Sequence, residues 1–196
     1  MNVRNQVKTK EGTKMNNQRT IPIDLPRKSE VDTASTNKSG VPATAQDKEL
    51  ALKVRELNRL LADEYTLFTK TLNYHWNITG PRFKSVHEFL ETQYKDLLEM
   101  IDDVAERVRE VGGYAIGTLE EIKGASTLPE QPKSYPQTSE MISNLRSDHM
   151  HIQKKIKSIL SLLDERWADP GSEDFLTSLL KKHEEMTWML TSHLES

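Results

Sequence analysis

Apolar residues that recur at steps of three and four constrain the fold of this chain more than any other feature. Between Asp47 and Asn77 the repeat is carried by Val54, Leu57, Leu61, Tyr65, Phe68, Leu72 and His75. Such steps place side chains on one face of an α-helix, whereas a strand would need strict alternation. The sequence does not indicate a strand anywhere, and we therefore expect an all-α protein.

Glycine and proline separate this first helix from a second one. The Gly-Pro pair at 80–81 ends the first helix, and the Gly-Gly pair at 112–113 ends the second. The start of the second helix has two interpretations. Ser85 and Glu88 have the spacing of a capping box, but Phe83 could equally lie in the first turn.

Two more helices follow a long connection. A stretch with two glycines and three prolines comes first, with a short helix near Leu119–Ile122. The third long helix has apolar residues in phase from Met141 to Leu163, and the fourth begins after Pro170 with Ser172 as its cap. Two helical hairpins joined by a long crossover describe a ferritin-like four-helix bundle.

Residues 1–45 differ in composition from the rest of the chain. They are rich in Ser, Thr, Asn and Lys and lack spaced apolar residues, so they cannot bury a core. The first 28 residues hold seven Lys or Arg and two acidic residues, a net +5, which leaves −8 for the remainder because the total is −3. We expect 1–45 to be a disordered basic arm on a bundle domain, 46–196. The arm could bind DNA or be a solvated extension.

Composition excludes several classes of protein. The chain has 196 residues and no cysteine, which rules out disulfides, thiolate nucleophiles and Cys-containing zinc fingers. A run of about 18 apolar residues is missing, which disfavours a membrane span, and the start MNVRNQVKTK lacks the apolar stretch of a secretory signal. We therefore expect a cytoplasmic protein in which nitrogen and oxygen ligands hold any metal.

The second helix carries residues with metal-ligating side chains on one stripe. At about 100° per residue they lie at roughly 0, 40, 60 and 100° around the axis, in the order His87, Glu91, Asp102 and Glu106. Each of the pairs 87/91 and 102/106 is spaced i, i+4 and covers one patch of the surface. The stripe flanks the apolar face, so it could be a partly buried metal site or a solvated acidic face.

The two pairs are too far apart to bind one ion within a chain. Fifteen residues separate their centres, which corresponds to roughly 22 Å along the helix. If the helix packs antiparallel against its own copy, each His87 end meets an Asp102 end, and two mixed sites form. His75, in phase with the stripe of the first helix, could add a second imidazole. This donor set suits iron or another divalent transition metal, with zinc as a competitor.

The histidines also speak against an intrachain di-iron site of the usual kind. That site needs Glu-x-x-His on two helices, and none of the six histidines is preceded by Glu at this spacing. His149 and His183 fall in phase with apolar neighbours, which favours core or interface histidines over ligands.

The run HWNITGPRFKSVHEFLETQYKDLLEMIDDVAERVREVGG, 75–113, closely resembles the Dps family, the mini-ferritins that protect bacterial DNA during starvation and oxidative stress. The resemblance rests on His-Trp-Asn at 75–77, then on Gly80, Phe83 and His87, and on Asp102 with Ala-Glu-Arg at 105–107. It implies that the ferroxidase ligands, shared between two subunits, are His75, His87, Asp102 and Glu106. Glu91 stands where the family more often has Asp, and it completes the expected set. Trp76 matches an aromatic residue that either intercepts radicals or packs beside the site.

The resemblance also implies an activity and an assembly. We expect a hollow homododecamer that oxidises Fe(II) at inter-subunit sites, preferably with hydrogen peroxide, and stores Fe(III) inside. DNA would be protected because both reagents that generate hydroxyl radical are consumed, and the arm could add sequence-independent DNA binding at the nucleoid. One alternative is a structural nucleoid-binding homologue with an inactive ferroxidase site. A second, a ferritin that uses dioxygen, is disfavoured by the missing Glu-x-x-His.

Overall fold

The computed structural model describes residues 44–163 and 169–195, and these residues form helices and connections without any strand. The helices are α1 (Ala45–Asn77), α2 (Phe83–Glu110), α3 (Leu119–Ala125), α4 (Thr138–Leu162) and α5 (Pro170–Ser192). The predicted all-α class is confirmed. Residues 1–43 lie outside the described part, so the division at residue 45 into arm and bundle stays a prediction.

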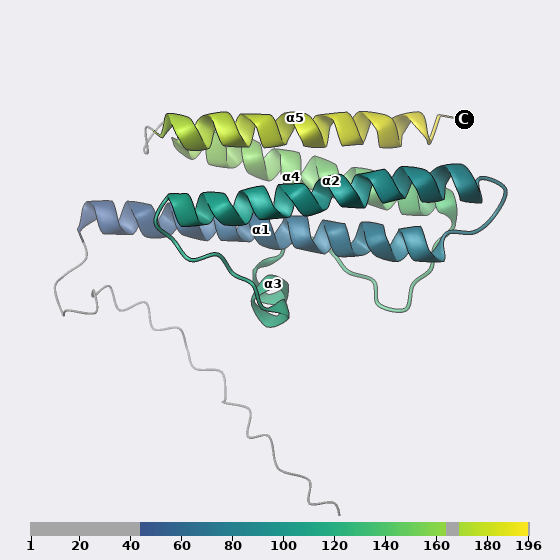
Figure 1. The fold of residues 1–196 in the computed structure, drawn as a ribbon, viewed down its shortest axis with the longest axis horizontal. Helices are drawn as coiled ribbons and strands as arrows, with labels where there is room; N and C mark the ends of the chain where they lie inside the picture. The colour runs from purple at the N-terminus through teal and green to yellow at the C-terminus, as the bar shows by residue number, and fades with distance from the viewer. Residues whose placement is uncertain (1–43, 164–168, 196) are drawn as a thin grey trace, which may run out of the picture. The chain divides into compact units, whose positions relative to one another are not determined.

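The four long helices form a bundle of two hairpins. α1 packs along α2, α4 packs along α5, and α1 also contacts α4, as Figure 1 shows. The connection from α2 to α4 is the predicted crossover, and it carries the short α3, which packs against α1. This is the ferritin-like arrangement that the sequence predicts. Among the described residues, no helix has an apolar stretch that could cross a membrane.

Two helix N-terminal caps that the sequence suggested, at Ser85 and Ser172, are not the caps in the structure. α2 begins at Phe83, and the hydroxyl of Ser85 donates to the Arg82 carbonyl, so the Ser85–Glu88 capping box is wrong. α5 begins at Pro170, and its cap is Asp169, whose carboxylate accepts the backbone N–H of Ser172. Ser172 therefore lies inside the first turn. Aspartate caps as well as serine does, and proline is favoured at the first helical position.

The most buried line of α1 lies slightly beside the predicted apolar stripe. Tyr65, Phe68 and Leu72 are only partly buried. The line that faces the bundle interior shares Leu57 and Leu61 with the predicted stripe and continues through Leu60, Glu64, Leu67 and Thr71. It includes polar residues, which a search for apolar periodicity passes over.

The buried carboxylate of Asp63 joins three parts of the fold. It belongs to α1, pairs with Lys155 of α4, and accepts hydrogen bonds from the Thr127 backbone N–H (2.5 Å) and hydroxyl (2.9 Å) in the crossover. Burial would raise the pKa of the Asp63 carboxyl, but the hydrogen bond and charge of Lys155 and the bonds from Thr127 outweigh it, so the pKa lies below its usual value. Asp63 is therefore ionised at neutral pH and fastens the crossover to both helices.

We predict that Asp63→Asn lowers the free energy of unfolding by about 3 kcal/mol at pH 7, because it leaves the ammonium of the partly buried Lys155 without a counter-charge. Since the carboxyl pKa is lower in the folded than in the unfolded chain, its contribution is complete above pH about 4 and disappears as the pH falls through the folded-state pKa. Urea unfolding followed by circular dichroism measures both effects.

The matched control is Glu184→Gln, which removes the half-exposed ion pair between Lys157 and Glu184 on the neighbouring helices. An exposed pair contributes less than about 1 kcal/mol, so this variant should unfold almost like the wild type. Equal losses for the two variants, or an Asp63→Asn effect that persists undiminished at acidic pH, would contradict the assignment.

Candidate metal centre

His75 and His87 meet where the first hairpin turns. His75 lies at the end of α1 and His87 in the second turn of α2, and the short connection between the helices folds them together. Their rings stack with centroids 3.7 Å apart and planes 20° from parallel. The structure therefore brings the two predicted imidazoles side by side within one chain.

Reciprocal hydrogen bonds fix the orientation of both rings. Nδ1 of His75 lies 2.9 Å from the His87 carbonyl oxygen, and Nδ1 of His87 lies 2.9 Å from the His75 carbonyl oxygen. A carbonyl oxygen can only accept, so each Nδ1 carries a proton, and in the neutral form of each ring Nε2 has the lone pair. Histidine ligands are typically held in this way by a bond from the other ring nitrogen. The pair is thus oriented to offer two nitrogen donors.

Aromatic rings cover the imidazole pair on two sides. Tyr94 packs edge-on against His75 at 5.2 Å, and Phe83 stacks on His87 at 5.0 Å. His75 is 8% exposed and His87 is half-buried. Water therefore has limited access to this half of the centre.

Glu91 lies one helical turn after His87, and its carboxylate pairs with Lys95 at 2.5 Å. The hydrogen bond and charge of Lys95, with smaller contributions from His75 and His87, hold the pKa of Glu91 below its usual value. The lowered pKa keeps the carboxylate ionised at neutral pH, and the side chain is accessible because it is 39% exposed. Binding of a cation here would compete with Lys95 for the carboxylate.

Asp102 and Glu106 do not join the imidazoles within the chain. Both are exposed on α2, and the helical rise places them roughly 22 Å from the His87–Glu91 pair. Over residues 44–163 and 169–195, no three His, Asp or Glu side chains come together in a metal-ligating arrangement. A single chain thus presents the predicted ligands as two separate groups.

Trp76 follows His75 but points away from the core of its own chain, since it is 67% exposed. Packing inside the bundle is therefore not its role. The exposed indole leaves two functions open, namely contact with a neighbouring subunit and chemistry at the surface of the centre.

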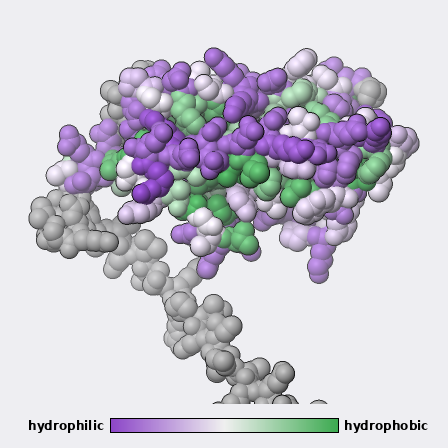
Figure 2. Space-filling view, in the orientation of Figure 1, coloured by the Kyte–Doolittle hydropathy of each residue, from purple (hydrophilic) through white to green (hydrophobic). Residues whose placement is uncertain are grey.

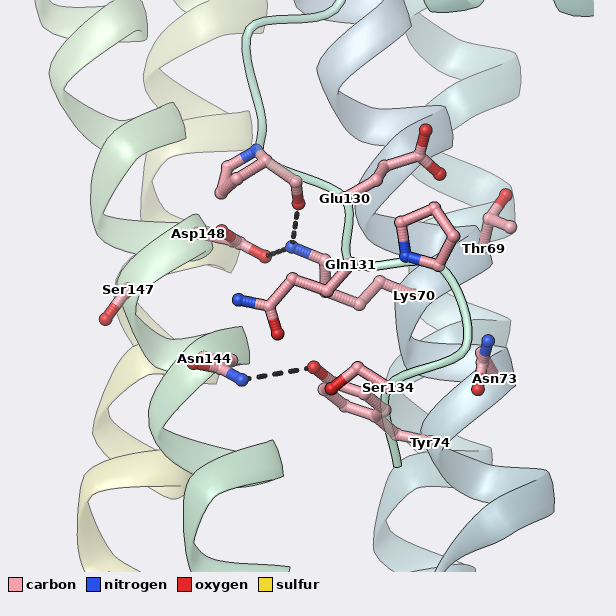
Figure 3. A pocket seen from close by; sticks show the side chains of 12 residues that line it. Thr69, Lys70, Asn73, Tyr74, Glu130, Gln131, Ser134, Asn144, Ser147 and Asp148 are labelled. Atoms are coloured by element: carbon pink, nitrogen blue, oxygen red, sulfur yellow. Dashed lines mark hydrogen bonds and ion pairs between the residues drawn. The ribbon is translucent and has the colours of Figure 1, made fainter. Parts of the chain in front are cut away.

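A polar pocket of about 280 Å³ lies between α1, α4 and the crossover and contains none of the predicted ligands. In Figure 3, Lys70 reaches across it to Asp148 (2.5 Å) and to the Pro129 carbonyl, while Asn144 donates to the Tyr74 hydroxyl. Burial raises the pKa of Asp148, although Lys70 partly opposes this. The ion pair is satisfied within the chain, and Lys70 of α1 links α4 to the crossover through it.

The prediction that His149 and His183 are core histidines is confirmed, since they are 1% and 0% exposed. Burial, together with the charge of His183, lowers the pKa of His149 well below its usual value, so His149 is neutral. The sequence analysis did not predict two other buried polar residues, Glu64, which contacts His183 at 2.7 Å, and Gln93. A charged residue in phase with Leu57, Leu60 and Leu61 was the available signal.

Comparison with known proteins identifies the family. The model of the ferritin-like domain matches residues 54–196. A DNA protection during starvation protein of Helicobacter pylori is 32% identical over 138 residues, which cover 70% of this chain and 95% of that protein. The chain belongs to the Dps family. A low temperature-induced protein of Nostoc is 42% identical over 139 residues, 71% of this chain and 78% of the relative.

A solved Dps structure has the same fold. The Dps protein of Vibrio cholerae, described as a member of a broad superfamily of ferritin-like diiron-carboxylate proteins, superimposes with a TM-score of 0.71 at 26% identity. The alignment covers 82% of this chain and 97% of that one. Almost the whole of a Dps subunit is thus represented in this chain.

Proposed function

We propose that the chain is a ferroxidase and iron-storage subunit that oxidises Fe(II) at centres shared between two copies and stores Fe(III) in a hollow homododecamer. The observation that carries this proposal is the oriented imidazole pair, in which His75 and His87 both present Nε2. Membership of the Dps family and the diiron-carboxylate description of the Vibrio relative support iron as the substrate. Zinc, which takes similar ligands, would compete.

The surface of α2 suits the antiparallel contact that such centres need. Leu98, near the middle of the helix, is 53% exposed, and it lies beside Ile101 and Ala105 in a shallow depression that Asp102 also lines. Figure 2 shows hydrophobic side chains between hydrophilic ones on the face that α2 occupies. An exposed apolar patch rimmed by polar residues is typical of a protein contact. A two-fold axis there would bring each His87 toward the partner's Asp102 end.

The residues of the chain divide the chemical work in this arrangement. The imidazoles of His75 and His87 bind Fe(II) as neutral donors, and Glu91, Asp102 and Glu106 of the paired copies supply negative charge. Carboxylates stabilise the rising positive charge as iron is oxidised. Each centre would have five protein ligands, which leave coordination positions open for the oxidant. Tyr94 and Phe83 exclude water from one side of the imidazoles.

We predict that two inactive variants restore activity when they are co-assembled. His75→Ala/His87→Ala subunits lack the imidazoles, and Asp102→Ala/Glu106→Ala subunits lack the carboxylates. Each contact between unlike subunits then contains one intact and one doubly defective centre, so random equal mixing should give about a quarter of the wild-type centres. Stopped-flow absorbance of Fe(III) formation measures the recovered fraction.

Separately purified variants mixed without subunit exchange provide the control and should stay inactive. Recovery no greater than either parent, in co-assembled particles whose mixed composition mass spectrometry has verified, would show that each centre is built within one chain.

The proposed centre should prefer hydrogen peroxide over dioxygen, which rests on the Dps resemblance. We predict that anaerobic protein loaded with Fe(II) oxidises it faster with peroxide than with dioxygen at equal concentration. The Asp102→Ala/Glu106→Ala variant should lose the preference along with the rate. Faster oxidation by dioxygen would point to an ordinary storage ferritin, and the absence of oxidation with either reagent would favour the structural nucleoid-binding alternative.

The arm, 1–45, supports a second proposed activity, sequence-independent DNA binding at the nucleoid of the cytoplasm. Its first 28 residues carry a net charge of +5 and twelve copies would act together, although the −8 of the remainder opposes binding. We predict that full-length particles shift DNA in a gel at low salt and release it at physiological salt. Particles without residues 1–28 should not shift it. Retention by the truncated particle, or no shift at low salt, would remove DNA binding and leave the ferroxidase proposal intact.

A further inference from the structure

The interior of the bundle contains a row of three titratable side chains that links the two hairpins. Glu64 belongs to α1 in the first hairpin, and His149 and His183 belong to α4 and α5 in the second. Each of the three is at most 1% exposed. Nε2 of His183 lies 2.7 Å from Oε1 of Glu64, and Nδ1 of His183 lies 2.8 Å from Nδ1 of His149. The ring of His183 therefore joins Glu64 of one hairpin to His149 of the other.

The two distances set the number of protons that this buried row can hold. Each is a hydrogen-bond distance, so one proton lies between His183 and Glu64 and one lies between the two rings. A second proton at the ring contact would place two N–H donors against each other at 2.8 Å. The geometry thus accepts one protonation state of the row and rejects the state with one proton more.

Burial decides where the charges of this state lie. If both bridging protons belong to His183, its ring is a cation beside the Glu64 carboxylate, and His149 is neutral. If the proton between the rings belongs to His149, His183 is neutral and the carboxylate stays in the core without a counter-charge. A buried unpaired charge is strongly unfavourable. The row is therefore neutral as a whole, with a proton shared between Glu64 and His183.

Within the described residues, the elements packed around the row offer no further charge to balance an added proton. The buried side chains of α2 are uncharged, as are Gln153 and Thr187, which donate to the His183 carbonyl. The charged residues next to the row in sequence are paired: Asp63 with Lys155, Asp148 with Lys70, Glu184 with Lys157, and Lys182 with Asp103. One more proton would therefore leave an uncompensated positive charge in the core.

We infer that Glu64, His183 and His149 form an acid-sensitive latch, which holds the two hairpins together at neutral pH and opens when the row takes up one more proton. On Nδ1 of His149 this proton breaks the contact between the rings, because both nitrogens are then donors. On Glu64 it removes the negative charge that His183 requires. Either position leaves a positive charge among apolar side chains, which weakens the packing of one hairpin against the other. Histidine clusters act as pH switches for the same reason.

The pKa of His149 gives the direction of the pH dependence. Burial and the charge of His183 hold this pKa well below its usual value. The unfolded chain takes up a proton at His149 near pH about 6.5, whereas the folded chain does not. The stabilisation is therefore complete above pH about 6.5 and is lost as the pH falls below that value. The contribution of Asp63 changes only near pH about 4 and below, so the two effects can be measured apart.

The test compares the urea unfolding of the assembled protein at pH about 7.5 and pH about 5.5, followed by circular dichroism at one protein concentration. We expect His149 to raise the unfolding equilibrium constant of the wild type about tenfold at the lower pH. His149→Asn keeps an oxygen that accepts the Nδ1–H of His183 but cannot take up a proton, so this variant should lose the tenfold dependence. His151→Gln, a change of an exposed histidine on the same helix, should retain it.

Hydrogen exchange of α5 adds a measurement on the unmodified chain. After correction for the intrinsic effect of pH on exchange, the amides around His183 should be less protected at the lower pH. His149→Asn should show equal protection at both pH values, and His149→Gln takes its place if that variant does not fold. The latch would be overturned by unchanged protection in the wild type, by a folded His149 variant that keeps the full pH dependence, or by its loss in His151→Gln.

Discussion

The ionised carboxylate of Asp63 is the interaction on which the arrangement of the two hairpins depends. The crossover between α2 and α4 is long, and Ile122 and Leu128 are the large apolar side chains that it buries. Asp63 gives this segment a defined attachment through Thr127 and Ser126, and it gives α4 a defined register through Lys155. Because the charge is buried, its partners must approach closely, and alternative registers of α4 would leave it unpaired.

The candidate centre depends on a different feature, the short connection between α1 and α2. That connection places the end of one helix against the start of the next, so His75 and His87 lie side by side although twelve residues separate them. The pairing of each Nδ1 with the other residue's carbonyl oxygen then selects one tautomer for both rings. Fold and ligand orientation are thus determined by the same turn.

The helices, the crossover and the location of the two imidazoles could be predicted from the sequence because periodicity and glycine or proline breaks report them directly. The cap at Asp169 and the start of α2 could not, since several residues near each end can satisfy the same backbone groups. Stacking of His75 on His87 depends on the angle of the turn, which spacing does not define. Glu64 and Gln93 were missed for a simpler reason: a search for apolar stripes treats a buried carboxylate or amide as surface.

The reciprocal hydrogen bonds of His75 and His87 have a consequence for when the protein becomes reactive. Both rings are oriented by bonds within a single chain. A newly synthesised subunit therefore already contains the imidazole half of the proposed centre. In the proposed centre, the carboxylates at the far end of α2 serve the neighbouring subunit. In the proposed arrangement a solitary subunit would lack the partner's carboxylates, and iron oxidation would begin only when two subunits pair.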